Sequence, residues 1–331
     1  MSWRDAESHQ ATHIPFVATG AYPVRAGHRV RPLVDGERAF RRVCEAIDQA
    51  QARVWVAVTF LWADFQMPDG RGSFFEVLTR ARRRGLDVRV IFWRPDEASA
   101  ELRTNAFWGS PEHRALLKEE ASDVSIRWDR AQAGFCQHQK FWVLDAGLDA
   151  GCAFVGGINL NPHSVVAPGH RGAEQNHDIY VEVSGPAVTD IHHNFVQRWN
   201  EASERQETDG RWGPDADRDL GFPTEVAAAR GLAVVQVQRT IQAGRYTDTR
   251  PVPDGTPFAI AGGEFSNRDQ YIQAIRAARE CIYLETQAIS VQPILDELVG
   301  AIGRGVAVVL VAPPTASSTD QPADGRTGLF H

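Results

Sequence analysis

The sequence has few cysteines, no excess of basic residues and no long apolar run. Only 4 of the 331 residues are cysteine; none has the CxxC spacing of a redox or zinc motif, which favours the reduced thiols of a cytosolic protein. The 35 Lys and Arg residues are outnumbered by 42 Asp and Glu, giving a net charge of −7. Proteins that bind nucleic-acid phosphates usually carry a basic excess. We therefore expect no nucleic-acid partner, but the charge balance does not exclude an enzyme that cleaves phosphodiesters.

Membrane-spanning segments are not predicted either. The longest clear apolar runs, at 54–60 and 306–312, are far shorter than the roughly 18–20 residues that cross a bilayer. The first residues include acids and have no apolar stretch of the kind found in signal peptides. We expect a cytoplasmic protein, with peripheral attachment to a membrane surface as the alternative.

The order of the predicted elements is typical of an α/β fold. Apolar residues at helical spacing alternate with short β-rich segments. The predicted elements are strands at 29–33, 54–60 and 86–92, and helices at 37–51 and 73–84. Ser73 is placed to cap the second helix and Gly85 to end it. This alternation predicts parallel pairing of the strands.

A partial internal repeat predicts a second unit of the same kind. Ala46-Ile47-x-x-Ala50, with the strand after it, recurs as Ala274-Ile275-x-x-Ala278 with a strand at 282–284. An acidic segment containing Pro and Gly lies between the two copies, as is typical of a linker. We divide the chain into an irregular lead-in at 1–28, a first lobe at 29–200, a linker at 201–230 and a partial second lobe at 231–331.

The strongest candidate site lies at 137–145. Its aromatic and β-branched residues predict a strand. On a strand His138 and Lys140 share one face, because side chains i and i+2 point the same way. Asp145 lies where this strand would end. A turn and a second strand then predict a hairpin that brings Asn159 back beside His138 and Lys140.

These residue types suit a phosphoryl group. An imidazole can act as a nucleophile near neutral pH. An ammonium and an amide would stabilise the charge on the phosphoryl oxygens. Gly156 and Gly157 leave room for backbone N–H groups to approach an anion. The segment therefore predicts phosphodiester chemistry.

The pattern His138-x-Lys140-x-x-x-x-Asp145, followed by Gly156-Gly157-x-Asn159, resembles the HKD motif of the phospholipase D superfamily. The segments at 176–187 and 195–200 are similar to those after this motif in true phospholipases D, and 282–287 resembles the strand that opens the family's second half. The resemblance implies an α/β fold with a mixed β-sheet flanked by helices on both faces, plus a truncated second lobe of the same kind.

The resemblance also implies a mechanism. Two HKD motifs meet, one histidine attacks phosphorus to form a phosphohistidine, and the other protonates the leaving alcohol, with no metal or cofactor. His138 would be the nucleophile, while Lys140, Asn159 and Gly157 would hold the phosphate.

Four further residues receive roles by the same resemblance or by position. Asp178 matches the acid that hydrogen-bonds the nucleophilic imidazole and fixes its tautomer. Asp145 matches the motif aspartate, for which we expect a role more structural than chemical. Glu285 and Gln287 lie on one face of a predicted strand and are expected to support the site, with a purely structural role equally open.

A second HKD motif is expected beyond His331 by the repeat, and residues 313–331 contain no HxKxxxxD pattern. We therefore expect a truncated product or a fragment. A symmetric homodimer or a second chain would then supply the other histidine. Without such a partner the chain would be an inactive remnant that binds phosphate groups or lipid.

The expected function is hydrolysis of the headgroup phosphodiester of a phospholipid, or transfer of its phosphatidyl group to another alcohol. The alternatives within the same chemistry are a cardiolipin-synthase-like transferase and a nuclease. The acidic balance argues against the nuclease.

Overall fold

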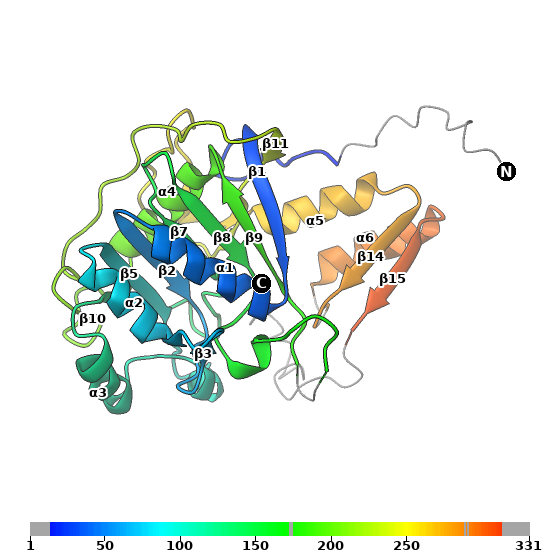
Figure 1. Cartoon of the computed structure of the whole chain (residues 1–331). Coiled ribbons are helices and arrows are strands. Elements are labelled where there is room, and N and C mark those ends of the chain that lie inside the picture. Colours follow the sequence, from blue (N-terminus) through cyan, green and yellow to red (C-terminus); the bar gives the residue numbers. More distant parts are fainter. Residues whose placement is uncertain (1–13, 172–174, 288, 290, 313–331) are drawn as a thin grey trace.

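A mixed sheet of nine strands is the centre of the fold (Figure 1). The computed structural model describes residues 14–171, 175–287, 289 and 291–312. The sheet has the order β10-β6-β5-β2-β7-β8-β9-β1-β11. Its strands are β1 (Arg25–Val34), β2 (Arg53–Val58), β5 (Asp87–Trp93), β6 (Ser125–Asp129), β7 (Phe141–Leu144), β8 (Cys152–Gly156), β9 (Ile179–Ser184), β10 (Arg211–Trp212) and β11 (Ala233–Val235).

Shorter strand pairs and six α-helices complete the described chain. The pairs are β3 (Gln66–Met67) with β4 (Gly72–Ser73), β12 (Thr240–Ile241) with β13 (Glu264–Phe265), and β14 (Cys281–Glu285) with β15 (Ala307–Val311). The helices are α1 (Gly36–Gln49), α2 (Phe74–Arg83), α3 (Pro111–Glu120), α4 (Ala187–Asn200), α5 (Ser266–Ala277) and α6 (Gln292–Gly303). Within the described ranges, none of these helices is long and apolar enough to cross a membrane.

Alternating side chains divide the central sheet into two buried faces. In β2, Val54 and Val56 pack with α1 and α2, whereas Trp55 and Ala57 pack with α4. This is the period of two that a strand imposes, and both faces are apolar because helices cover both (Figure 1). The predicted α/β fold, with a mixed sheet flanked by helices on both faces, is confirmed.

Strand direction changes across the sheet. β2, β5 and β6 are parallel to one another, whereas β7, β8, β9 and β1 follow β2 in antiparallel pairs. The carboxyl ends of the parallel strands therefore meet the start of β7, the end of β8 and the start of β9. Loops at this edge of an α/β sheet commonly carry ligand sites.

The predicted roles of Ser73 and Gly85 at the two ends of α2 are confirmed. The Ser73 hydroxyl accepts a hydrogen bond from the Glu76 amide, and the Glu76 carboxylate accepts one from the Ser73 amide, the reciprocal pair of a capping box. Gly85 follows the helix at φ +89°, where glycine avoids the strain that a side chain would cause.

Two predicted boundaries differ from the structure. β1 begins at Arg25, inside the lead-in of 1–28, because β11 and β9 provide partner strands along its length. The linker of 201–230 lies against the first lobe: β10 pairs with β6, and Leu220 and Phe222 pack on the α4 side of the sheet. Its Pro and Gly residues thus belong to a surface excursion that extends the sheet.

The repeated unit is present as α5, β14, α6 and β15. β14 and β15 pair in parallel with Ile282 opposite Val308, as β2 and β5 pair with Val54 opposite Val88. The unit has a small apolar cluster of its own and lies beside the first lobe (Figure 1).

Candidate active site

His138 and Lys140 lie in an irregular segment just before β7, at the sheet edge described above. The predicted strand over 137–145 is too long, since β7 begins at Phe141. The ladder between β2 and β7 ends at the pair Ala57–Phe141, so the preceding residues have no partner strand. The Thr59 hydroxyl lies 3.1 Å from the Gln137 carbonyl oxygen and 3.3 Å from that of Gln139.

Lys140 is buried beside the His138 backbone. Its Nζ donates a hydrogen bond of 3.0 Å to the His138 carbonyl oxygen and lies 5.9 Å from the centre of the Phe60 ring. Burial disfavours the charged ammonium and lowers the pKa of Lys140 to about 8. The amine therefore titrates near neutral pH.

His138 is half-buried and contacts the same aromatic ring. The imidazole meets the Phe60 ring edge-on, with the ring centres 5.8 Å apart. Phe60 is thus a shared platform for the imidazole and the ammonium.

The predicted hairpin of β7 and β8 is confirmed, and Gly157 follows it; the pairing of β8 with β9 brings Asp178 beside Gly157. β7 and β8 pair with Phe141 opposite Val155, and the Gly156 amide donates to the Lys140 carbonyl oxygen at 3.3 Å. A Cβ atom on Gly157 would lie 2.5 Å from both carboxylate oxygens of Asp178. Glycine is required for this approach, because real Cβ atoms do not come so close to another atom.

Asp178 immediately precedes β9. Burial raises the pKa of its carboxyl group, an effect opposed by the hydrogen bond from the Ile179 amide and by the charge of Lys140. Asp178 and Lys140 therefore interact electrostatically across the site. A hydrogen bond between Asp178 and the His138 imidazole stays a prediction.

Asn159 follows the hairpin in an irregular segment and is half-buried. The amide of the next residue, Leu160, donates to the Phe60 carbonyl oxygen at 3.2 Å, which fixes the segment beside the Phe60 platform. The side-chain oxygen of Asn159 is buried with no hydrogen-bond partner in the described chain. Buried polar groups without a partner are rare, and each calls for an explanation.

Asp145 lies at the other end of β7 and contacts only backbone amides among its described hydrogen bonds. Its carboxylate accepts from the amides of Gln51 and Ala52, each at 2.8 Å, and of Arg53 at 3.0 Å. These bonds fasten the connection between α1 and β2. The structural role expected of Asp145 stays a prediction, and its carboxylate lies at the end of β7 opposite to His138 and Lys140.

Glu285 reaches the site region from β14. Its carboxylate lies 3.4 Å from Nε2 of His177, the residue before Asp178, and accepts a hydrogen bond from the Tyr283 hydroxyl. Gln287 is exposed just after β14. Glu285 therefore contacts the residue before Asp178, and its support of the site stays a prediction.

Three residues near the site are not predicted from the sequence. Thr59 and Phe60 follow β2 and contact the segment around His138, a proximity that only the pairing of β2 with β7 creates. Arg198 on α4 is fully buried, and its charge further lowers the pKa of Lys140. The sequence points to the segment containing Arg198 only through the family resemblance.

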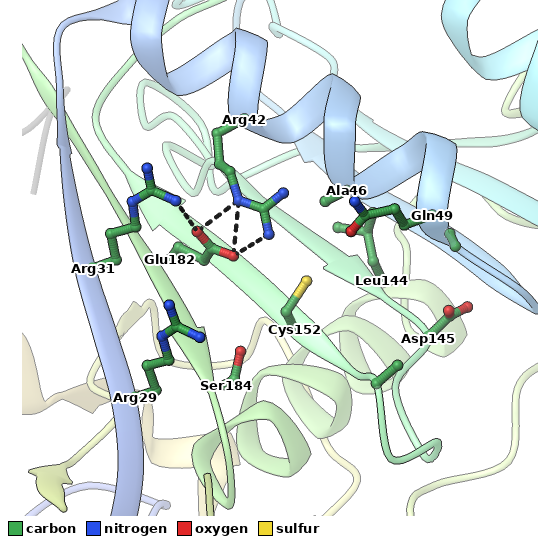
Figure 2. A pocket seen from close by; sticks show the side chains of 12 residues that line it. Arg29, Arg31, Arg42, Ala46, Gln49, Leu144, Asp145, Cys152, Glu182 and Ser184 are labelled. Atoms are coloured by element: carbon green, nitrogen blue, oxygen red, sulfur yellow. Dashed lines mark hydrogen bonds and ion pairs between the residues drawn. The ribbon is translucent and has the colours of Figure 1, made fainter. Parts of the chain in front are cut away.

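A cleft lies elsewhere, at the far ends of β7, β8 and β9 on the α1 face (Figure 2). Arg42 on α1 donates three hydrogen bonds of 2.6–3.2 Å to Glu182, and Arg31 lies 3.8 Å from the same carboxylate. Figure 2 shows Cys152 on the floor and Asp145 at one end. The cleft contains neither His138 nor Lys140 and is separate from the candidate active site.

Two family profiles match the chain. The family described as "Cardiolipin synthase, PLD-like domain" matches residues 43–199, which include the whole candidate site. The family described as "Phospholipase D" matches residues 161–290. Both descriptions name the same superfamily, and together they extend across both units of the chain.

Curated relatives are similar over most of this chain. Phospholipase D alpha 1 of Arabidopsis thaliana is 25% identical over 84% of the chain, and that of Brassica oleracea var. capitata is 24% identical over the same share. The chain spans only 42% of the length of these relatives.

Solved structures of lower similarity also match. The phospholipase D family member Nuc of Salmonella typhimurium is 17% identical, with a TM-score of 0.37, and covers 53% of this chain and 96% of its own. Phosphatidylserine synthase of Haemophilus influenzae Rd KW20 is 13% identical, with a TM-score of 0.48, over an alignment that covers 90% of this chain and 65% of the synthase chain. On the evidence of the family profiles and the curated relatives, the chain belongs to the phospholipase D superfamily.

Proposed function

We propose that this chain is a phosphodiesterase that acts on the headgroup phosphodiester of a phospholipid through His138. The observation that supports it best is the buried Lys140 ammonium, held 3.0 Å from the His138 carbonyl oxygen with Phe60 beneath both side chains. A cation in a low-dielectric setting beside an imidazole suits the binding and attack of a phosphoryl group. The burial of Lys140 is costly, and a bound phosphate would offset that cost.

The proposed reaction has two steps. A nitrogen of His138 bonds to phosphorus while the bond to the headgroup oxygen breaks, and a general acid protonates the departing oxygen. Water, or another alcohol, then attacks the phosphohistidine, loses its proton to the same group and releases the lipid product. Asp178 would stabilise the imidazole during both steps.

The general acid is proposed to be a second histidine. A second copy of this chain in a homodimer, or a second chain, would contribute it. A symmetric dimer would place two equivalent imidazoles at one twofold axis. Such a pair supplies acid and base at neutral pH when the two rings hold different numbers of protons.

A phospholipid is proposed as the substrate because the similar proteins bear the names phospholipase D alpha 1 and cardiolipin synthase. The profile over residues 43–199 also favours a second candidate, transfer of a phosphatidyl group to an alcohol of a second lipid. Attachment to the membrane surface would accompany either reaction.

The test is single-turnover reaction with phosphatidylcholine labelled at phosphorus, quenched in alkali because phosphohistidine is labile to acid. We expect label on the protein, and none in His138→Ala. His163→Gln is the control, since His163 lies in a nearby loop against Trp62. Equal labelling of wild type and His138→Ala would overturn the assignment. No labelling of a folded dimer would favour a binding remnant, and labelled phosphatidylglycerol formed with added glycerol would identify transfer.

A further inference from the structure

Two histidines and a buried carboxylate meet just beyond the candidate active site. Nε2 of His170 lies 2.9 Å from one carboxylate oxygen of Asp35, and Nδ1 of His177 lies 2.8 Å from the other. One ligand atom from each of these three residues lies within 4.8 Å of the other two. The carboxylate is only 5% exposed, whereas the imidazoles are 37% and 49% exposed.

The second nitrogen of His177 also has a partner. Its Nε2 faces the carboxylate of Glu285 at 3.4 Å. Histidines that bind metals commonly donate their other ring N–H to a carboxylate, which fixes the tautomer and the ring orientation. With Nε2 donating to Glu285, Nδ1 can give up the proton that it shares with Asp35 and present its lone pair to an ion held with Asp35 and His170.

We propose that Asp35, His170 and His177 bind a divalent transition-metal ion of the zinc type. Two imidazoles and one carboxylate leave a fourth position for water, the composition of an open zinc site. Nitrogen donors select zinc or cobalt over magnesium and calcium, which prefer oxygen ligands. This site does not depend on the proposed phosphodiesterase activity.

The geometry requires only a small adjustment. Zinc binds these donors at about 2.0–2.2 Å in a tetrahedron, so neighbouring donors are about 3.4 Å apart. The present separations of 2.8 Å and 2.9 Å are those of hydrogen bonds. Because the two imidazoles are partly exposed, each can move outward by about half an ångström when the ion replaces the shared protons.

The ion would be coupled to the active site through the backbone. The Asp35 amide donates a hydrogen bond of 2.9 Å to the carbonyl oxygen of Asp178, and His177 directly precedes Asp178 in the chain. A metal ion held by Asp35 and His177 would thus restrain Asp178 from both sides. It would support the site without contacting the phosphorus.

The test uses the full chain, freed of metal by a chelator, at neutral pH. Titration calorimetry with zinc chloride should show one ion per chain, and cobalt should give the intense visible absorption of tetrahedral coordination. His170→Ala and His177→Ala should each weaken zinc binding by at least 10-fold and abolish the cobalt spectrum. Asp35→Asn should do the same, and asparagine is nearly identical in shape to the aspartate that it replaces.

Matched variants distinguish this site from adventitious zinc binding by histidines elsewhere on the surface. His163→Gln, in the same loop as His170, should bind zinc as tightly as wild type. Glu285→Gln should weaken binding by roughly 10–100-fold without removing the cobalt spectrum, as expected for a residue that orients a ligand. Far-ultraviolet circular dichroism checks that each variant is folded. Zinc affinity unchanged in the folded His170→Ala/His177→Ala double variant would overturn the proposal, as would a cobalt spectrum of octahedral type in the wild type.

Discussion

The Nζ of Lys140 donates a hydrogen bond of 3.0 Å to the carbonyl oxygen of His138, two residues earlier in the chain. On a regular strand the two side chains would project in parallel; here the lysine side chain instead turns back to the backbone of the histidine. A phosphate would have to replace this carbonyl as the partner of the ammonium. The state of charge of Lys140 should therefore control phosphate binding.

Phosphate affinity should fall as the pH rises through about 8. Burial lowers the pKa of Lys140 to about 8, so the amine is charged below that pH and neutral above it. Inhibition by inorganic phosphate, measured between pH 6.5 and 9.5, should weaken by about 10-fold per pH unit above the transition. A bound phosphate would favour the charged amine and displace the transition upward.

Lys140→Arg provides the control for this pH dependence. A guanidinium stays charged throughout this range, so phosphate inhibition in the variant should be nearly independent of pH, even if it is weaker overall. The same pH transition in Lys140→Arg would show that a different group causes it.

Gly157→Ala should reduce activity by at least 10-fold while the protein stays folded. The added methyl group would meet both oxygens of Asp178 at 2.5 Å and displace that carboxylate. If the effect passes through Asp178, the double variant Gly157→Ala/Asp178→Ala should be no slower than Asp178→Ala alone. Gly300→Ala in α6 has only the end of the Arg304 side chain within 4 Å, at 3.8 Å, and should leave activity unchanged. Additive losses in the double variant would contradict this interpretation.

Asp145→Asn should destabilise the protein and leave the chemistry intact. The carboxylate accepts three amide hydrogen bonds, and the amide group of asparagine would turn a donor toward at least one of these donors. We expect a loss of about 1–3 kcal/mol in the free energy of unfolding, measured by urea denaturation. Asp149→Asn lies in the same turn but is 92% exposed, so its stability should equal that of wild type. A loss of turnover in Asp145→Asn without a loss of stability would contradict a structural role for Asp145.

Acid should destabilise the protein through α4. Burial lowers the pKa of His192 to about 3 and that of His193 to about 4, whereas in the unfolded chain both titrate near 6.5. The unfolded state therefore binds more protons between these values, and stability falls as the pH drops below about 6.5. The free energy of unfolding should decrease by more than about 1 kcal/mol from pH 7 to pH 5.

The histidines of α4 can be tested separately. His192→Phe removes one titrating group and keeps an aromatic ring against Trp55, so its loss of stability on acidification should be smaller than that of wild type. His163→Gln should follow the wild-type curve. Identical acid sensitivity in His192→Phe and wild type would exclude His192 as a cause.

Local sequence signals predicted the elements of the first lobe well. Ser73 and Gly85 mark the ends of α2 because capping and a left-handed C-terminal residue are properties of a few neighbouring residues. The apolar runs at 54–60 and 86–92 became β2 and β5 for a similar reason, as each is rich in residues that favour a buried strand.

The misplaced start of β7 has a tertiary cause. The strand residues Phe141 to Leu144 led us to extend the strand back to residue 137, but β2 ends at Val58 and provides no ladder partner before Phe141. Propensity cannot report where a partner strand stops. Asp35 likewise lies 135 residues from His170, and no local pattern connects the two. Their meeting depends on the pairing of β1 with β9.

Because β1 pairs with β9, β1 stays without this partner strand during synthesis until β9 has been made. β1 is made early, but Val34 pairs with Ile179, which leaves the ribosome roughly 150 residues later. At about 5–20 residues per second the nascent β1 waits on the order of 10 seconds with its edge unpaired. Contacts so distant along the chain are slow to form, and an unpaired edge invites association with other chains. The arginines of this strand, among them Arg29 and Arg31, place positive charges along that edge and would keep nascent copies apart.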